Sequence, residues 1–227
     1  MGIAVLLLCS YLLGSIPFGM IVGRARGVDI RQHGSGNIGA TNVLRVLGPG
    51  PAALVFAGDV TKGLVPVLVG GALLRSWAVP RADLWVLAVA LAPILGHTFS
   101  VFLRFRGGRA VATTLGALLG MSWPAGVIGL CIWIVVVGLT RYISLASIIA
   151  SPFVPVYLAL SGNRLAWCVF WAAIAALIIA RHIPNIGRLL EGTEPKIGKG
   201  VEVEGNGQEE RREAHDDLAG RGRPERP

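Results

Sequence analysis

Apolar residues run in long blocks through most of the chain, and short polar stretches separate the blocks. Several blocks approach or reach the roughly 20 residues that a helix needs to cross a bilayer. The pattern predicts spans over about 3–22, 51–74, 84–103, 126–139, a segment ending near 160, and 165–180. The fold class predicted is therefore an all-α, polytopic integral membrane protein with about seven transmembrane helical elements, some of them short or broken.

Three places in these blocks depart from a simple span. Residues 114–121 are too few to cross alone, so they form either a half-length or re-entrant helix or one partner of a helical pair with the next span. Pro17 removes a backbone hydrogen bond and predicts a kink in the first span. Asp59 and Lys62 stand three apart in the second span. Ionisable residues inside a membrane are costly, so this pair is either functional or an ion pair that orients the helix near the cytoplasmic surface.

Composition and charge agree with a membrane protein. Of 227 residues, 53% are hydrophobic and 15% charged, and the mean hydropathy is +0.64. In soluble domains roughly a quarter of the residues are charged, so this composition excludes an ordinary soluble protein. The net charge is +8, and the arginines cluster at the ends of apolar blocks, as in positive-inside loops. This distribution predicts the bilayer and not nucleic acid as the partner. It also predicts a membrane protein with its N-terminus outside and its polar loops and C-terminus in the cytoplasm.

The chain is expected to hold one transmembrane domain, residues 1–198, and a charged cytoplasmic tail, residues 199–227. The tail has almost no large apolar side chain to offset the entropy of ordering, so it is expected to be disordered and without a catalytic role. Cys9, Cys131 and Cys168 lie in apolar blocks without short spacing, which predicts neither disulfides nor a metal site. No acidic pair has the spacing to hold magnesium, and no cofactor is predicted.

The most unusual stretch is the polar run Gly34–Arg45 between the first two spans. Its glycines allow backbone N–H groups to turn toward an anion. Its Ser, Thr and Asn residues supply neutral hydrogen bonds, and Arg45 supplies a planar fork that suits phosphate. The alternative is a turn that caps a helix beginning near Thr41. A second basic, glycine-bearing loop, Arg104–Thr113, follows the third span.

Two further polar stretches, Arg141–Ser147 and Arg181–Arg188, fall on the same predicted side of the membrane as both loops. The four stretches could converge on one site with two phosphate cradles. Other acyl-transfer machinery is absent: neither His97 nor His182 is followed four residues later by Asp, and no G-x-S-x-G elbow occurs. Acyl transfer here would rest on positioning and electrostatics, with a substrate phosphate accepting the proton.

Five segments together resemble the bacterial PlsY family. They are Gly14–Gly19, Gly34–Arg45, Gly96–Thr113, Arg141–Ser147 and Arg181–Glu194, and the match covers about residues 14–198. The resemblance implies a seven-helix inner-membrane acyl-phosphate:glycerol-3-phosphate acyltransferase of phospholipid biosynthesis. Such an enzyme makes lysophosphatidic acid and releases inorganic phosphate. Its substrates would be acyl phosphate and glycerol-3-phosphate, and the enzyme that supplies acyl phosphate would be a natural partner.

The resemblance also implies site residues. The expected catalytic residues are Ser35, Arg45, Arg106, Ser144 and Asn185. The expected substrate-binding residues are Asn37, Thr41, Asn42, Gly107, Gly108, Arg109, Thr113, His182 and Arg188. Which phosphate occupies which loop stays open, and His97 at a helix end is interpreted as a capping residue.

The second loop departs from the family pattern. Arg106 and Arg109 stand where lysines are usual, Ala110 stands where glycine is usual, and Ser100 stands where proline is usual. Two other functions remain as alternatives. A transporter or exchanger of an organic phosphate would use broken helices around a central site. A membrane adaptor without chemistry would leave the phosphate-type donors unexplained.

Overall fold

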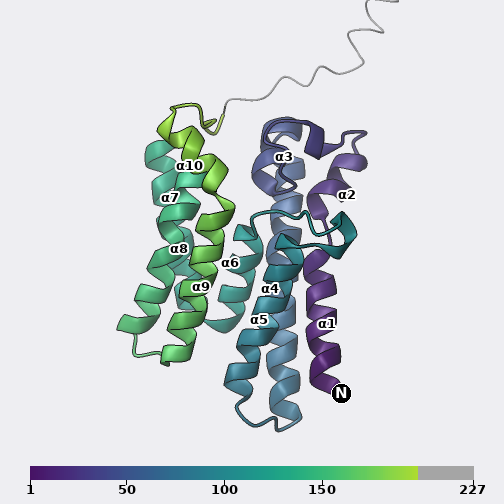
Figure 1. The fold of residues 1–227 in the computed structure, drawn as a ribbon, viewed down its shortest axis with the longest axis vertical. Helices are drawn as coiled ribbons and strands as arrows, with labels where there is room; N and C mark the ends of the chain where they lie inside the picture. The colour runs from purple at the N-terminus through teal and green to yellow at the C-terminus, as the bar shows by residue number, and fades with distance from the viewer. Residues whose placement is uncertain (199–227) are drawn as a thin grey trace, which may run out of the picture.

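The computed structural model describes residues 1–198, and within that range every regular element is a helix (Figure 1). The predicted tail, residues 199–227, lies outside the described residues. In chain order the elements are α1 (Gly2–Ser15), α2 (Phe18–Arg24), η1 (Ile30–Gln32), α3 (Ala40–Leu47), α4 (Pro49–Ser76), α5 (Ala82–Thr98), η2 (Val101–Leu103), α6 (Val111–Met121), α7 (Trp123–Thr140), α8 (Ile143–Leu160), α9 (Leu165–Arg181) and α10 (Ile183–Leu190), where η marks a 3-10 helix.

The membrane-spanning prediction is confirmed. Five segments of the described residues are long and apolar enough to cross a bilayer: Gly2–Arg24, Pro49–Ser76, Ala82–Leu103, Trp123–Thr140 and Ile143–Leu160. The pair α9–α10, bent by 56°, makes a sixth if it counts as one span. The short helix α6 matches one of the two alternatives that the sequence left open for this region, a half-length helix. The predicted kink at Pro17 is a full break between α1 and α2.

The helices form two groups that α6 joins (Figure 1). Helix α1 packs on α5 and α4 packs on α5 and α6, whereas α7, α8 and α9 pack in sequence on the other side. A buried apolar core that includes Ile94, Leu118, Leu158 and Trp171 connects the two groups. Because lipid tails are as apolar as these side chains, close packing must supply much of the association energy.

Glycines make that close packing possible. A side chain at Gly14 would collide with the Pro93 backbone, and one at Gly96 would collide with the Tyr11 carbonyl, so α1 and α5 touch through their backbones. Helices α4 and α6 touch in the same way, because a side chain at Gly116 would meet the Val60 carbonyl. The short helix α6 is thereby held rigidly against the longest span.

The polar elements gather at the end of the molecule away from the N-terminus. Figure 1 shows α2, α3 and α10 at this end, beside the upper ends of the long helices. A second apolar core, with Met20, Ile30, Val43 and Val55 at its centre, packs beneath the loop that precedes α3. This core fixes α3 and its loop on α2 and α4, and so it positions the polar run of the first loop.

Candidate active site

Asn42 holds the first glycine-rich loop in shape. Its side chain is only 1% exposed; Oδ1 accepts the Ser35 N–H at 2.8 Å, and Nδ2 donates to the carbonyls of Ile30 and His33 at 3.0 Å each. Gly34 and Gly36 have φ values of 59° and 67°, in the left-handed region that suits glycine. The run is therefore a turn that precedes a helix, as the alternative had it, and it is also one wall of a cavity.

The second loop folds back onto the end of α5. The Gly107 N–H donates to the Thr98 carbonyl at 3.1 Å, and the Gly108 N–H donates to the His97 carbonyl at 3.0 Å. A side chain at either glycine would collide with His97. Arg181 donates to the Gly107 carbonyl at 3.2 Å and so ties this loop to the end of α9.

Glu194 is a site residue that the sequence interpretation did not assign. It is 5% exposed and accepts hydrogen bonds from Ser144 Oγ at 2.8 Å, Asn185 Nδ2 at 2.7 Å and Arg188 Nε at 2.7 Å. The next residue, Pro195, accepts a hydrogen bond from Arg45 at 3.2 Å. The available signal was an acid at the end of the basic stretch Arg181–Glu194, two residues of which, Asn185 and Arg188, donate hydrogen bonds to it.

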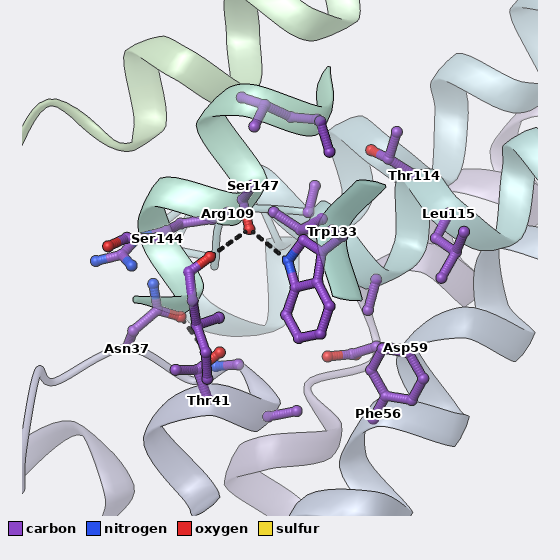
Figure 2. Close-up of a pocket in the computed structure, with 18 of the residues that line it drawn as sticks. Asn37, Thr41, Phe56, Asp59, Arg109, Thr114, Leu115, Trp133, Ser144 and Ser147 are labelled. Atoms are coloured by element: carbon purple, nitrogen blue, oxygen red, sulfur yellow. Dashed lines mark hydrogen bonds between the residues drawn. The ribbon is translucent and has the colours of Figure 1, made fainter. Parts of the chain in front are cut away.

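All four polar stretches border one cavity of about 410 Å³, here called the long cavity. Its polar end is lined by Ser35, Asn37, Thr41, Asn42, Arg45, Arg109, Ser144, His182 and Glu194. Its apolar part is lined by Phe56, Leu115, Leu118, Leu130, Trp133, Val154 and Ile178. Figure 2 shows Arg109, Ser144 and Asn37 on one side of this space and Phe56 and Leu115 on the other, with the Trp133 ring between them.

A second space of about 340 Å³, here called the basic cavity, lies beside the first. It is lined by Arg31, Ser35, Gly36, Asn37, Ile38, Arg106, Gly107 and Arg109. Ser35, Asn37 and Arg109 line both spaces, so the two cavities share a wall. The arrangement places two neighbouring polar chambers at the mouth of one apolar channel.

The charge at this mouth is positive. Within residues 1–198, Arg45, Arg106 and Arg109 have no carboxylate within 4.0 Å, whereas Arg31 pairs with Asp29 at 2.7 Å. Burial lowers the pKa of Arg109 to about 10, and burial also lowers the pKa of Arg45. Even so, a pKa of about 10 is well above neutral pH, and arginine keeps its charge under such conditions. Both arginines are therefore available to bind an anion.

Glu194 is ionised despite its burial. Burial raises the pKa of its carboxyl, but the hydrogen bonds from Asn185, Ser144 and Arg188 outweigh burial and hold the pKa below its usual value. Its three hydrogen bonds hold the carboxylate in place, and its charge also raises the pKa of Arg45 and Arg109, against the effect of burial.

Two helices begin at the long cavity. Gly39, Ala40 and Thr41 at the start of α3 line it, and so do Ala110, Val111 and Ala112 at the start of α6. Helix N-termini carry free N–H groups and a partial positive charge, which favour phosphate. Together with the arginines they make a site for an anionic head with an apolar tail.

The predicted residues fall into three groups. Ser35, Asn37, Thr41, Asn42, Arg45, Arg109, Ser144 and His182 line the long cavity, and Arg106 and Gly107 line the basic cavity. Asn185 and Arg188 lie behind this lining and reach it through Glu194. Gly108 and Thr113 line neither cavity: Gly108 packs on His97, and Thr113 is fully buried at the contact of α6 with Gly63. The chemical roles of these residues remain predictions.

Comparison with known proteins gives one consistent result. The family model described as glycerol-3-phosphate acyltransferase matches residues 4–192. A glycerol-3-phosphate acyltransferase of Geobacter sulfurreducens is 49% identical over 189 residues, which cover 83% of this chain and 94% of the relative. One of Synechococcus sp. (strain JA-2-3B'a(2-13)) is 46% identical over 191 residues, covering 84% and 92%.

Solved structures agree with these relatives. The crystal structure of PlsY, an integral membrane glycerol 3-phosphate acyltransferase, in its glycerol 3-phosphate form superposes with a TM-score of 0.81 at 38% identity. That alignment covers 87% of this chain and 96% of the other. The lysophosphatidic acid form of the same protein gives a TM-score of 0.78, also at 38% identity, over 88% and 97%.

Proposed function

We propose, since the chain belongs to the glycerol-3-phosphate acyltransferase family, that it is a membrane acyltransferase that uses acyl phosphate as its donor. The acceptor would be the sn-1 hydroxyl of glycerol-3-phosphate. The products would be lysophosphatidic acid and inorganic phosphate, formed without metal or coenzyme A. The upstream enzyme that supplies acyl phosphate is then its expected partner.

The observation that carries this proposal is the shape and charge of the long cavity. An apolar channel between α6, α7 and α8 opens into a polar mouth with arginines that lack carboxylate partners among the described residues. A fatty acyl chain fits the apolar part, and its phosphate fits the mouth. The basic cavity beside it offers room for the phosphate of a second substrate.

The residues at the mouth have distinct proposed tasks. Arg45, Arg106 and Arg109 hold phosphate by charge and by forked hydrogen bonds. Ser35, Asn37 and Ser144 supply neutral donors and acceptors for the hydroxyl and carbonyl groups. Asn185, Arg188 and Glu194 form a support that fixes Ser144 and the end of α9.

The proposed chemical step is a direct displacement. The hydroxyl oxygen of glycerol-3-phosphate attacks the acyl carbon, and the bond between that carbon and the phosphate oxygen breaks. The departing phosphate takes the hydroxyl proton, so the products are an ester and hydrogen phosphate. The two helix N-termini and the arginines stabilise the negative charge that develops on the carbonyl and phosphate oxygens. The main contribution to catalysis is then that the site holds two anionic substrates next to each other in reactive geometry, although they repel each other.

The test is a single-donor assay with the purified full-length chain in detergent. Palmitoyl phosphate and labelled glycerol-3-phosphate are mixed with EDTA and without coenzyme A. We expect labelled lysophosphatidic acid and inorganic phosphate in equal amounts. Absence of product would overturn the function, and product formed from palmitoyl-coenzyme A alone would overturn the donor.

Two variants test the site within that assay. Arg45→Ala removes a phosphate fork, and Asn185→Ala removes a donor to Glu194, so each should lower kcat/KM by about 100-fold or more. Arg164→Ala is a matched control, because Arg164 pairs with Asp83 at the opposite end of the molecule. Full activity in both site variants would show that the site has been placed wrongly.

A further inference from the structure

Three ionisable side chains are buried in a cluster that the proposed reaction does not use. Asp59 and Lys62 on α4 are each 2% exposed, and His97 near the end of α5 is 4% exposed. Lys62 Nζ lies 2.8 Å from Asp59 Oδ1, and His97 Nδ1 lies 3.6 Å from the same oxygen. The carboxylate therefore stands between an ammonium group and an imidazole.

Lys62 connects this cluster to the break in the first span. Its Nζ donates to the Ile16 carbonyl at 2.8 Å, next to Pro17. Ser100 Oγ donates to the neighbouring Ser15 carbonyl at 2.6 Å. Because a proline interrupts the helical hydrogen bonds here, these two side chains supply donors to carbonyls at the break.

His97 connects the same cluster to the second glycine loop. Its carbonyl accepts the Gly108 N–H, and the next carbonyl, of Thr98, accepts the Gly107 N–H. The imidazole packs directly on Gly108, since any side chain at that glycine would collide with Nε2. The position of the His97 ring and backbone thus fixes where Gly107 and Gly108 lie.

If the cluster served only to orient α4 through an ion pair, Asp59 and Lys62 would be sufficient and His97 would not be needed. The carboxylate has a further task available, because His97 Nδ1 is buried without a hydrogen-bond partner among residues 1–198 and lies 3.6 Å from the Asp59 oxygen that Lys62 already contacts. Asp59 and His97 also line the long cavity, and Figure 2 shows Asp59 pointing into it. A buried imidazole nitrogen without a partner is costly, so contact with a carboxylate is favoured over apolar surroundings.

We infer that Asp59 and His97 form a positioning pair that holds the second glycine loop in place for phosphate. Lys62 neutralises the carboxylate and ties the pair to the break between α1 and α2, so that both phosphate cradles are anchored to one buried point. The inference rests on the proposed function for its kinetic consequence. None of the three side chains is assigned a proton-transfer step.

The kinetic test compares His97→Ala with His97→Asn. Asparagine keeps a donor near the Nδ1 position, whereas alanine removes the ring altogether. His97→Ala should raise KM by about tenfold for the one substrate whose phosphate lies in the second loop, and leave the KM of the other within about twofold. His97→Asn should recover most of the loss. Asp83→Asn, which breaks an exposed pair at the opposite end, is the control.

The double variant Asp59→Asn/Lys62→Met separates positioning from stability. It removes both buried charges together and so avoids the unpaired charge that Asp59→Asn alone would leave. We expect its Tm to lie close to that of the natural protein, while KM for the same single substrate stays raised. If this variant had the same KM values as the natural protein, the cluster would act only as an ion pair, and the inference would be overturned.

Hydrogen exchange tests the same point without any turnover. In the full chain, amides in residues 104–113 should exchange at least about tenfold faster in His97→Ala, while amides in residues 143–160 keep their rates. Unchanged exchange in residues 104–113, or equal acceleration in both segments, would overturn the inference. If the natural protein proved inactive, only the proposed function would be contradicted. The exchange result would still decide whether the Asp59–His97 pair positions the second glycine loop.

Discussion

The carboxylate of Glu194 accepts hydrogen bonds from side chains on α8 and α10, and through Pro195 its segment also contacts α3. A buried carboxylate with three donors is stable as an anion, whereas its protonated form would lose acceptor capacity toward Arg188 and Asn185. One residue therefore ties together the polar ends of several helices. Among residues 1–198 it does so without forming a direct ion pair with Arg45 or Arg109.

The first prediction concerns acid pH. Since folding lowers the pKa of Glu194 below its usual 4.5, this group stabilises the folded protein above that pH and loses its contribution as pH falls through the folded pKa. As pH falls below the usual pKa of 4.5, the Tm of the natural protein should drop more steeply than that of Glu194→Gln. Parallel curves would show that the hydrogen bonds to Glu194 contribute little to folding.

The second prediction concerns Ala110, which precedes α6 with a φ of 59°. A left-handed alanine costs roughly 1–2 kcal/mol, and glycine avoids this cost while losing about 0.5–1 kcal/mol of chain entropy. Ala110→Gly should therefore stabilise the protein by about 0.5–1 kcal/mol in thermal or chemical unfolding. Ala112→Gly, inside α6, is the control and should destabilise by about 1 kcal/mol. A loss of stability in both variants would contradict the strain at Ala110.

Among the helices, the contact of α4 with α6 matters most for the site. Helix α6 begins directly after the second glycine loop. Its backbone contacts α4 at two glycines, Gly63 on α4 and Gly116 on α6. Such close contacts allow dispersion and weak C–H···O bonds to accumulate where lipid provides no hydrophobic drive. The packing of α6 against α4 therefore fixes the position of the second glycine loop, which directly precedes α6.

The third prediction follows from that contact. A side chain at Gly63 would collide with the Thr113 carbonyl, so Gly63→Leu should push α6 away from α4. We expect a loss of about 1–3 kcal/mol in stability and a fall in activity, because the second loop moves with α6. Gly138→Leu on α7 is the matched control, since no atom lies near a side chain at that position. Equal effects in the two variants would argue against a specific role of the α4–α6 contact.

The whole molecule has a strongly basic end and an opposite end with fewer charges. Arg24, Arg26, Arg45, Arg106 and Arg181 belong to the end that holds the cavities. The opposite end keeps Arg75, Arg81 and Arg164, and Arg164 pairs with Asp83. From the positive-inside rule we propose that the cavity end faces the cytoplasm and that the N-terminus lies outside. Both substrates would then reach the site from the cytoplasmic side.

The fourth prediction tests this orientation in intact cells. In a variant without native cysteines, Asn163→Cys should react with a membrane-impermeant maleimide from outside, whereas Arg26→Cys should react only after the cells are opened. Asn163 lies in the turn between α8 and α9, and Arg26 follows α2 at the other end. Labelling of Arg26→Cys in intact cells would reverse the orientation.

How much of the site was predictable varies by residue. The loops around Ser35, Arg45 and Arg109 stood out because glycines, amides and arginines are unusual between apolar blocks. Glu194 was missed because nothing local distinguishes it from Glu191, and one of its three donors, Ser144, comes from a distant helix. His97 was interpreted as a helix cap, since its contact with Asp59 joins positions far apart in the sequence.

The sequence by itself determined that the chain is a bundle of membrane helices, because the length and polarity of each block are local properties. It also determined the polar stretches and, through its motifs, the family. Only the tertiary structure decided that these stretches share two adjoining cavities and that Asp59, Lys62 and His97 meet in one buried cluster. Such contacts depend on glycine-mediated packing between helices, and helix periodicity alone does not encode which pairs of helices come that close.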